Sequence, residues 1–183
     1  MENKSRQTLA VLVDNEAGVL SLISRMFSRK GYNIESLAVG VTEDPTVSRI
    51  TIEVMADEPQ VELLCNQLRK LFPVHSVKRL TPDRSIRREL VLIKVSSDKS
   101  EIRGEIIQIA NIFRASIIDV SVETVTLAVI GDESKVEAMQ RLVEPYGILE
   151  MVRTGIVALE RGTYTITEDT KEKGEFNYGK NVL

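Results

Sequence analysis

One order of apolar and polar patterns occurs twice along the chain. The first half alternates short apolar runs, typical of strands, with apolar residues spaced three or four apart, typical of helices. Gly31 and Pro73 mark the ends of the two helical patterns. The predicted elements are a strand at 9–13, a helix with Val19, Leu22, Ile23, Met26 and Phe27 on one face, strands at 34–42 and around 50–54, a helix with Val61, Leu64, Leu68 and Leu71 on one side, and a strand at 74–80.

The second half repeats this order. Its apolar runs again predict four strands and its helical spacings two helices. The predicted elements are a strand at 90–95, a helix face of Ile102, Ile106, Ile109, Ala110 and Phe113, strands at 117–122 and 125–130, a helix face of Val136, Met139, Val143 and Tyr146, and a final strand from Ile148 to Leu159.

A polar segment that contains proline, residues 81–88, separates the halves and is predicted to be a linker between domains at residues 1–80 and 89–162. After Gly162 the apolar periodicity stops, so residues 163–183 are predicted to form a polar tail that is flexible or docked on a partner. The arginines of the linker are expected to be solvated: Arg84, Arg87 and Arg88.

Each half fits the βαββαβ, or ferredoxin-like, unit, so the predicted fold class is α+β with two such domains in tandem. Right-handed crossovers place both helices on one face of a four-stranded antiparallel sheet. The opening strands, residues 9–13 and 90–95, are apolar on both faces apart from Lys94, which is typical of strands covered on both sides. We therefore expect open faces or edges to meet another subunit or the other domain, which makes the protein an obligate assembler.

Composition narrows the classes of function. With 24 Lys and Arg against 27 Asp and Glu, the chain has a formal net charge of −3 and no general basic surface for nucleic acid. It has no long uncharged apolar stretch and residues 1–7 are polar, so neither a membrane span nor a secretory signal is predicted. One cysteine, Cys65, excludes an internal disulfide and favours a reducing compartment, the cytoplasm.

One loop is placed where a small anion could bind. Residues 15–20 lie between the first strand and the first helix, and a helix N-terminus offers unpaired N–H groups and a positive dipole end. Gly18 lets a ligand approach the backbone, and the Asn15 amide both donates and accepts. From these residues alone, a helix start capped by Asn15 without any ligand is favoured. Asn33 likewise has two interpretations, a ligand contact or a turn asparagine.

The sequence contains no recognisable catalytic grouping. The single histidine, His75, lacks an acidic neighbour in sequence and is predicted at the surface or on a sheet edge, while Cys65 is predicted to be a buried small side chain. Neither a zinc site nor a Cys/His pair is expected from these two residues. Glu43, Asp44 and Glu53 lack the spacing of paired acids or of a calcium loop, and phosphate-binding glycine motifs are absent.

Six blocks of sequence carry a family pattern. They are residues 12–20 (LVDNEAGVL), 27–37 (FSRKGYNIESL), 44–52 (DPTVSRITI), 88–95 (RELVLIKV), 112–120 (IFRASIIDV) and 155–162 (GIVALERG). Together these blocks resemble the small regulatory subunit of acetolactate synthase, also called acetohydroxyacid synthase. The resemblance runs from about Thr8 to Gly162, with the blocks in the family's order.

The resemblance implies an N-terminal ACT domain, a ferredoxin-like module that binds amino acids. Two copies are expected to pair side by side into one eight-stranded sheet and to bind an effector, usually valine, at their interface. The family's binding positions fall on the loop and on the start of the second strand of the facing copy. The expected effector-binding residues are Asn15, Ala17, Gly18, Val19, Leu20, Asn33 and Ile34. With the family in view, ligand binding becomes the favoured interpretation of the loop.

The resemblance also implies partners and cofactors. A separate large catalytic subunit is expected to carry thiamine diphosphate, a divalent metal and FAD, while this chain binds no cofactor and has no catalytic residues. The chain is expected to form a homodimer or higher oligomer, to activate the large subunit and to confer feedback inhibition. A stand-alone amino-acid sensor that regulates another enzyme or a transcription factor is the alternative, and an enzyme in its own right is a third.

Overall fold

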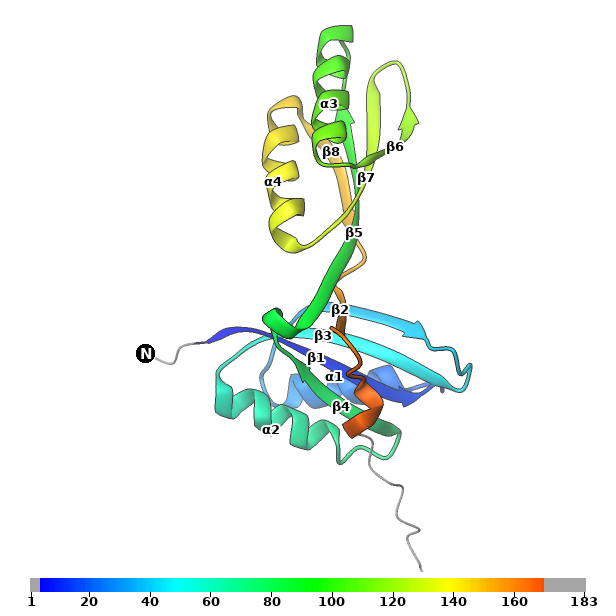
Figure 1. Ribbon diagram of the computed structural model, residues 1–183, viewed down its shortest axis with the longest axis vertical. Helices are drawn as coiled ribbons and strands as arrows, with labels where there is room; N and C mark the ends of the chain where they lie inside the picture. The colour runs from blue at the N-terminus through cyan, green and yellow to red at the C-terminus, as the bar shows by residue number, and fades with distance from the viewer. Residues whose placement is uncertain (1–3, 170–183) are drawn as a thin grey trace, which may run out of the picture.

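Two α+β units make up the described part of the protein. The computed structural model describes residues 4–169, and the units follow one another along the long axis of the molecule (Figure 1). The N-terminal unit contains β1 (Ser5–Asp14), α1 (Val19–Arg29), β2 (Ile34–Val41), β3 (Val47–Ala56), α2 (Glu58–Leu68) and β4 (Val74–Leu80). The C-terminal unit contains β5 (Ser85–Ser96), α3 (Ser100–Ile112), β6 (Ser116–Val120), β7 (Thr124–Gly131), α4 (Glu133–Val143) and β8 (Ile148–Arg153). The further elements are β9 (Val157–Glu160) and the 3-10 turns η1 (Pro82–Arg84), η2 (Glu144–Tyr146) and η3 (Ile166–Asp169).

Each unit has the topology that the sequence predicts. The strand order is β2-β3-β1-β4 in the first sheet and β6-β7-β5-β8 in the second, with antiparallel pairing throughout the described strands. The helices α1 and α2 lie on one face of the first sheet, and α3 and α4 on one face of the second (Figure 1). The predicted fold class, α+β with two ferredoxin-like units in tandem, is confirmed.

Apolar side chains at the expected periods form a separate core in each unit. In the N-terminal unit, alternate residues of β1 and β3 contact helical positions three or four apart, such as Ile23 and Phe27 of α1. Cys65 of α2 lies in this core, as predicted, and burial raises the pKa of its thiol. The second core is built in the same way by β5, β7, α3 and α4, with Ile93, Leu127, Ile106 and Met139 among its fully buried residues.

The long strand β5 pairs in two sheets. Its residues 89–96 pair with β7 and contribute to the second sheet, whereas residues 85–88 pair with β9. The predicted strand from Ile148 to Leu159 is therefore wrong as one element, because it divides into β8 and β9, which pair with different parts of β5. Gly155, with a φ of 80°, lies at the crossing between them.

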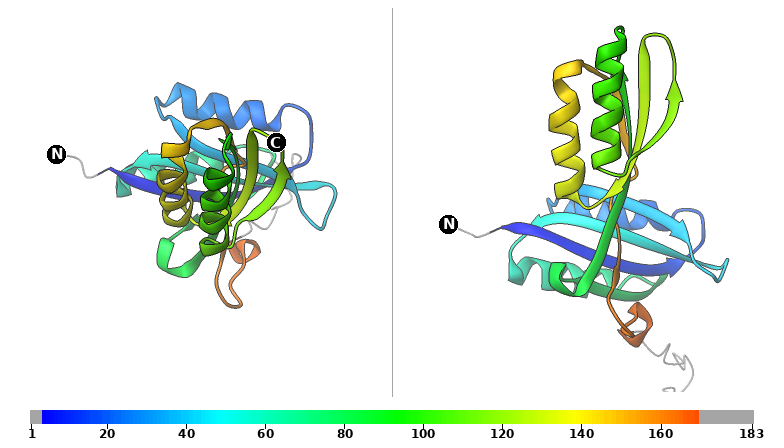
Figure 2. Two further views of the ribbon diagram at one scale, coloured as in Figure 1. Left: turned by 90° about the horizontal axis from the view of Figure 1, so that it is seen from above. Right: turned by 45° about the horizontal axis from the view of Figure 1, so that its top comes forward.

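The same chain covers part of the second face of the first sheet. The segment around β9 and the turn η3 pack on the face opposite α1 and α2 (right view of Figure 2). The contacting apolar side chains are Ala10, Leu12 and Leu80 of the sheet and Ile156, Ala158 and Ile166 of the covering segments. The polar tail predicted from residue 163 thus starts with a segment docked on its own chain, where the Ile166 carbonyl accepts from the Ser76 hydroxyl at 2.7 Å. Residues 170–183 lie outside the described residues.

The second sheet carries exposed apolar side chains on the face away from its helices. Leu90 of β5 pairs with Ile130 of β7, and Leu92 of β5 pairs with Val152 of β8. Leu90, Ile130 and Val152 are exposed. The expectation that an open sheet face meets another subunit therefore applies to this sheet more than to the first.

The N-terminal cap of α4 contributes to the stability of the C-terminal unit. The Asp132 carboxylate accepts from the Lys135 backbone N–H at 3.0 Å and from the Ser134 hydroxyl at 2.8 Å, and these donors hold the pKa of Asp132 below its ordinary value. We expect Asp132→Ala to lower the free energy of unfolding by about 1 kcal/mol at pH 7. The pKa of Asp132 is lower in the folded state than in the unfolded state, where it is about 3.9. The stability that its negative charge contributes is therefore fully present above the unfolded pKa and is lost as the pH falls through the folded pKa.

Asp132→Asn serves as the control, because asparagine keeps the capping acceptor but does not ionise. Denaturant unfolding between pH 7 and pH 3 should show a gap between wild type and Asp132→Ala that narrows in acid. The gap between Asp132→Asn and Asp132→Ala should stay constant. The capping role is wrong if Asp132→Ala is as stable as wild type at pH 7.

Candidate functional site

Asn15 ties the predicted binding loop to a distant turn. Its backbone N–H donates to the Thr46 carbonyl at 2.7 Å, and its side-chain amide donates to the Pro45 carbonyl at 2.9 Å. The amide oxygen accepts from the Ser48 hydroxyl at 3.1 Å. The alternative in which Asn15 caps α1 is therefore wrong, because its amide binds Pro45 of the β2–β3 turn and Ser48 of β3, and the residue at the cap position is Gly18.

The start of α1 has no side-chain cap. Gly18 has a left-handed φ of 91°, and no side chain hydrogen-bonds to the first turn. The first N–H groups of any α-helix lack an intrahelical acceptor, and the positive end of the helix dipole lies at the same place. The first turn also contains no acidic residue that would repel an anion. The geometry at Ala17, Gly18 and Val19 therefore suits a carboxylate or another small anion.

Asn33 and Ile34 lie at the other end of α1. The helix has 11 residues, so at about 1.5 Å per residue its two ends are about 16 Å apart. Asn33 is exposed and its amide donates to the Glu35 carboxylate at 2.8 Å, and Ile34 is half-buried at the start of β2. One chain therefore does not bring the two predicted groups of effector residues together.

The register of the first sheet shows which ends of β2 and β1 lie together. Val41, the last residue of β2, pairs with Ser48, and Asp14, the last residue of β1, pairs with the adjacent Val47. The C-terminal end of β2 is therefore level with the loop that starts at Asn15. Among the described strands β2 pairs with β3 alone, so its outer edge is free.

Both β2 and the neighbouring helix α1 carry exposed apolar side chains. The left view of Figure 2 shows α1 running alongside β2. Val39 and Val41 of β2 are 48% and 58% exposed, and Leu20 and Leu22 of α1 are also exposed. A free strand edge flanked by apolar side chains is typical of a surface that pairs with another chain.

The histidine has a partner that the sequence does not reveal. The His75 Nε2 atom lies 2.6 Å from an Asp14 carboxylate oxygen, although the two residues are 61 positions apart. His75 is on the edge strand β4, as predicted, and β4 pairs with β1 up to Val13. The pairing of these two strands is the signal that would have placed Asp14 beside His75, at the same end of the sheet as the candidate loop.

Charged side chains fill the junction between the two units. Glu53, 2% exposed, accepts from the Thr8 hydroxyl at 3.1 Å and lies 3.8 Å from Arg87. Glu89, 4% exposed, pairs with Arg153 at 3.1 Å. Burial raises the pKa of Glu89 and the Arg153 guanidinium opposes this shift. Arg87, expected to be solvated, instead lies mostly buried between the units and donates to Thr8.

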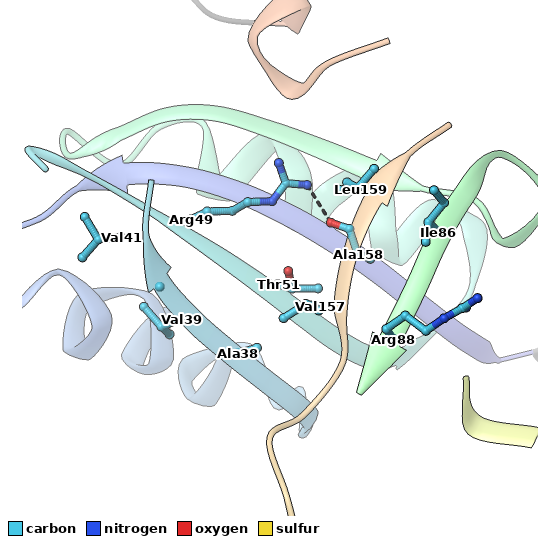
Figure 3. Close-up of a pocket in the computed structure, with 11 residues that line it drawn as sticks. Ala38, Val39, Val41, Arg49, Thr51, Ile86, Arg88, Val157, Ala158 and Leu159 are labelled. Atoms are coloured by element: carbon cyan, nitrogen blue, oxygen red, sulfur yellow. Dashed lines mark hydrogen bonds between the residues drawn. The ribbon is translucent and has the colours of Figure 1, made fainter. Parts of the chain in front are cut away.

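Two grooves open near this junction. The first, of about 430 Å³, lies between β2 and β3 on one side and β5 and β9 on the other (Figure 3). In it the Arg49 guanidinium donates to the Ala158 carbonyl at 2.7 Å. The second, of about 360 Å³, is lined mainly by the charged residues of the junction and by the crossing at Gly155. Neither groove includes a predicted effector residue.

Residues 4–169 offer neither a cluster of metal ligands nor a membrane span. No group of three histidine, cysteine, aspartate or glutamate side chains in this range is arranged to hold a metal ion. None of the helices in the range is long and apolar enough to cross a membrane.

The strand order and the placement of the helices define the class of protein, one with two ferredoxin-like units in tandem. Residues 9–76 match the family described as "AHAS small subunit-like ACT domain". Residues 88–162 match the family described as "Small subunit of acetolactate synthase". The two matches fall on the two units of the structure.

Individual relatives agree with these matches. The acetolactate synthase small subunit of Mycobacterium leprae is 48% identical over 155 residues, which are 85% of this chain and 91% of that one. That of Aquifex aeolicus is 44% identical over 167 residues, 91% of this chain and 86% of that one. The crystal structure of the small subunit from Thermotoga maritima matches with a TM-score of 0.82 at 38% identity, and covers 87% of this chain and 99% of that chain. The chain belongs to the acetolactate synthase small-subunit family.

Replacement of Gly18 tests the backbone geometry of the site. A Cβ at Gly18 meets nothing within 4 Å, so the strain of Gly18→Ala comes from the left-handed φ alone. We expect a loss of about 1–2 kcal/mol in the free energy of unfolding. Gly104→Ala in α3 also enters open space but has an ordinary helical backbone, and should gain about 0.5–1 kcal/mol. Denaturant unfolding that gives both variants the same sign would contradict this description.

Proposed function

We propose that this chain is the regulatory subunit that activates the large catalytic subunit of an acetolactate synthase and makes it sensitive to a branched-chain amino acid, valine first. Membership of the small-subunit family supports the partnership. In this proposal the complex is cytoplasmic, and thiamine diphosphate, a divalent metal and FAD belong to the large subunit. The observation that carries the ligand part is the start of α1, where no side chain caps the helix.

A second copy of the chain completes the site in this proposal. In a two-fold dimer, β2 of one copy runs antiparallel to β2 of the other, so the start of one strand meets the end of the other. The end of β2 at Val41 is level with the binding loop. Pairing therefore brings Asn33 and Ile34 of one copy to the loop of the other, and joins two four-stranded sheets into one of eight strands. It also covers the exposed Val39 and Val41.

Each part of the amino acid then has a partner of suitable chemistry. The carboxylate accepts from the backbone N–H groups of Ala17 and Gly18, and from that of Val19 in place of its 3.4 Å hydrogen bond to the Glu16 carbonyl. The ammonium group donates to the amide oxygen of Asn33, and the branched side chain lies between Leu20 and Ile34. Asn15, the seventh predicted residue, holds the loop in place, because its amide is already bound to the β2–β3 turn.

Two copies that share one ligand link binding to dimer geometry. A ligand changes a conformational equilibrium only by the difference in its affinity for the two conformations. A coupling free energy of about 1–3 kcal/mol, typical of allosteric proteins, changes an equilibrium several-fold or more. The effector therefore needs no contact with a catalytic residue in order to change the activity of the large subunit.

The first test reconstitutes the enzyme. Purified large subunit should form acetolactate from pyruvate several-fold faster when this chain is added, and valine should reverse that gain. Light scattering of the chain alone should give the mass of a dimer or a multiple of it. No stimulation together with no valine response would reject the proposal, and turnover by the chain alone would favour an enzyme in its own right.

The second test separates charge from backbone strain at the helix start. Gly18→Asp and Gly18→Ala both place a side chain on a left-handed backbone, which aspartate adopts more readily than alanine, and only aspartate adds a negative charge where the carboxylate binds. By calorimetry, valine affinity should fall at least about tenfold further in Gly18→Asp than in Gly18→Ala, a difference of about 1.4 kcal/mol. Asn33→Ala should weaken valine binding with no change of stability. Equal valine affinities in the two Gly18 variants would contradict the proposal that the valine carboxylate binds this loop.

A further inference from the structure

The crossing between β8 and β9 lies directly on β2. The chain leaves the second sheet at Arg153, passes residues 154–156 and enters β9 over the first sheet. The backbone N–H of Ile156 donates to the Ser36 hydroxyl of β2 at 2.9 Å, across 120 residues of sequence. The edge strand that we assign to the effector interface is thus hydrogen-bonded to the end of the C-terminal unit.

Gly155 allows this close approach. Its φ of 80° lies in the left-handed region, and an added Cβ would be 2.9 Å from the Leu37 carbonyl oxygen and 3.0 Å from the Ser36 hydroxyl. The Leu37 oxygen is backbone of β2 and cannot rotate away as the end of a side chain can. A side chain at position 155 therefore requires β2 or the crossing to move.

The position of the contact along β2 relates it to the effector residues. Ser36 and Leu37 are two and three residues from Ile34, in the segment where the β2–β3 register shifts between Ile34 and Ser36. A shift in register marks a β-bulge, where a strand is bent and less firmly held by its neighbour. The crossing thus contacts β2 beside its irregular part.

We propose that the contact of Ser36 with Gly155 and Ile156 couples the effector site to the C-terminal unit, so that effector binding reaches the large subunit through the C-terminal unit. The inference rests on the proposed function, because it assigns β2 to the effector interface. A ligand that fixes the start of β2 between two copies also fixes the segment on which the crossing lies. By linkage, the position of the C-terminal unit in turn sets the affinity of the site.

The structure offers a matched pair of glycine variants for the test. Gly162 has nearly the same backbone, with a φ of 74°, but an added Cβ there meets nothing within 4 Å. Gly155→Ala and Gly162→Ala therefore carry similar left-handed strain, and only the first pushes on β2. Ser36→Ala is the third variant, which removes the hydrogen bond to Ile156 without adding any atoms.

Three measurements are made on the full chain: activation of the large subunit, valine inhibition of the complex and valine binding by calorimetry. We expect Gly155→Ala and Ser36→Ala to activate and to bind valine within about twofold of wild type. The inhibition reached at saturating valine should fall at least about fivefold in both, because a ligand that still binds but is uncoupled no longer changes the activity. Gly162→Ala should behave as wild type in all three measurements.

Hydrogen–deuterium exchange reports the coupling without the large subunit. Valine should slow exchange at residues 148–160 in wild type and in Gly162→Ala, and should leave it unchanged in Gly155→Ala and Ser36→Ala. The inference is overturned if Ser36→Ala and Gly155→Ala are inhibited by valine and change their exchange as wild type does. It is also overturned if these two variants lose valine binding to the same extent as valine inhibition. A wild-type complex that does not respond to valine would instead reject the proposed function itself.

Discussion

The cover of the first sheet by the β5–β9 ribbon is the constraint on which the rest of the structure depends. A ferredoxin-like unit covers one face of its sheet with helices and leaves the other face open. Here β9, paired with the start of β5, lies on that open face, and β5 continues as an interior strand of the second sheet. Burial of Ala10 and Leu12 under this ribbon therefore also fixes where the C-terminal unit begins. The ribbon leaves the outer edge of β2 uncovered, where a second copy can pair.

The elements of each unit could be predicted because their periodicity reflects local burial. The spacing of Val19, Ile23 and Phe27 gives one helix face, and all three residues lie in the core. The division of the last strand could not be predicted in this way, since the apolar run from Ile148 to Leu159 is nearly continuous. The break at Gly155 is set by pairing with two separate parts of β5, which is a tertiary property.

The candidate site could be predicted from the sequence to a similar extent. A glycine between a strand pattern and a helix pattern indicates an accessible helix start, and the structure has Gly18 at that position with a left-handed backbone. The partners of Asn15 could not be predicted, because its amide binds a turn 30 residues away. The same applies to Asp14 and His75, which meet only because β1 and β4 are neighbours. Asn33 lies at the far end of α1, so within one chain it does not reach the loop at Gly18.

The charged side chains between the two units affect how a change in one unit is transmitted to the other. A buried ion pair adds little stability, but separating its members leaves buried charges unpaired at a cost of several kcal/mol. Glu53 of β3 and Arg87 of β5 therefore oppose any rotation of the units that parts them. Some of these cations have a second acceptor: Arg153 also reaches Gln140 at 2.9 Å, and Arg6 lies near both Glu53 and Glu133. Arg6 lies between a carboxylate of its own unit and one of the other unit, so it can change its acceptor and still be paired with a carboxylate in two alternative arrangements. A coupling of about 1–3 kcal/mol suffices to select between two such arrangements, whereas it would not suffice to break a buried pair outright.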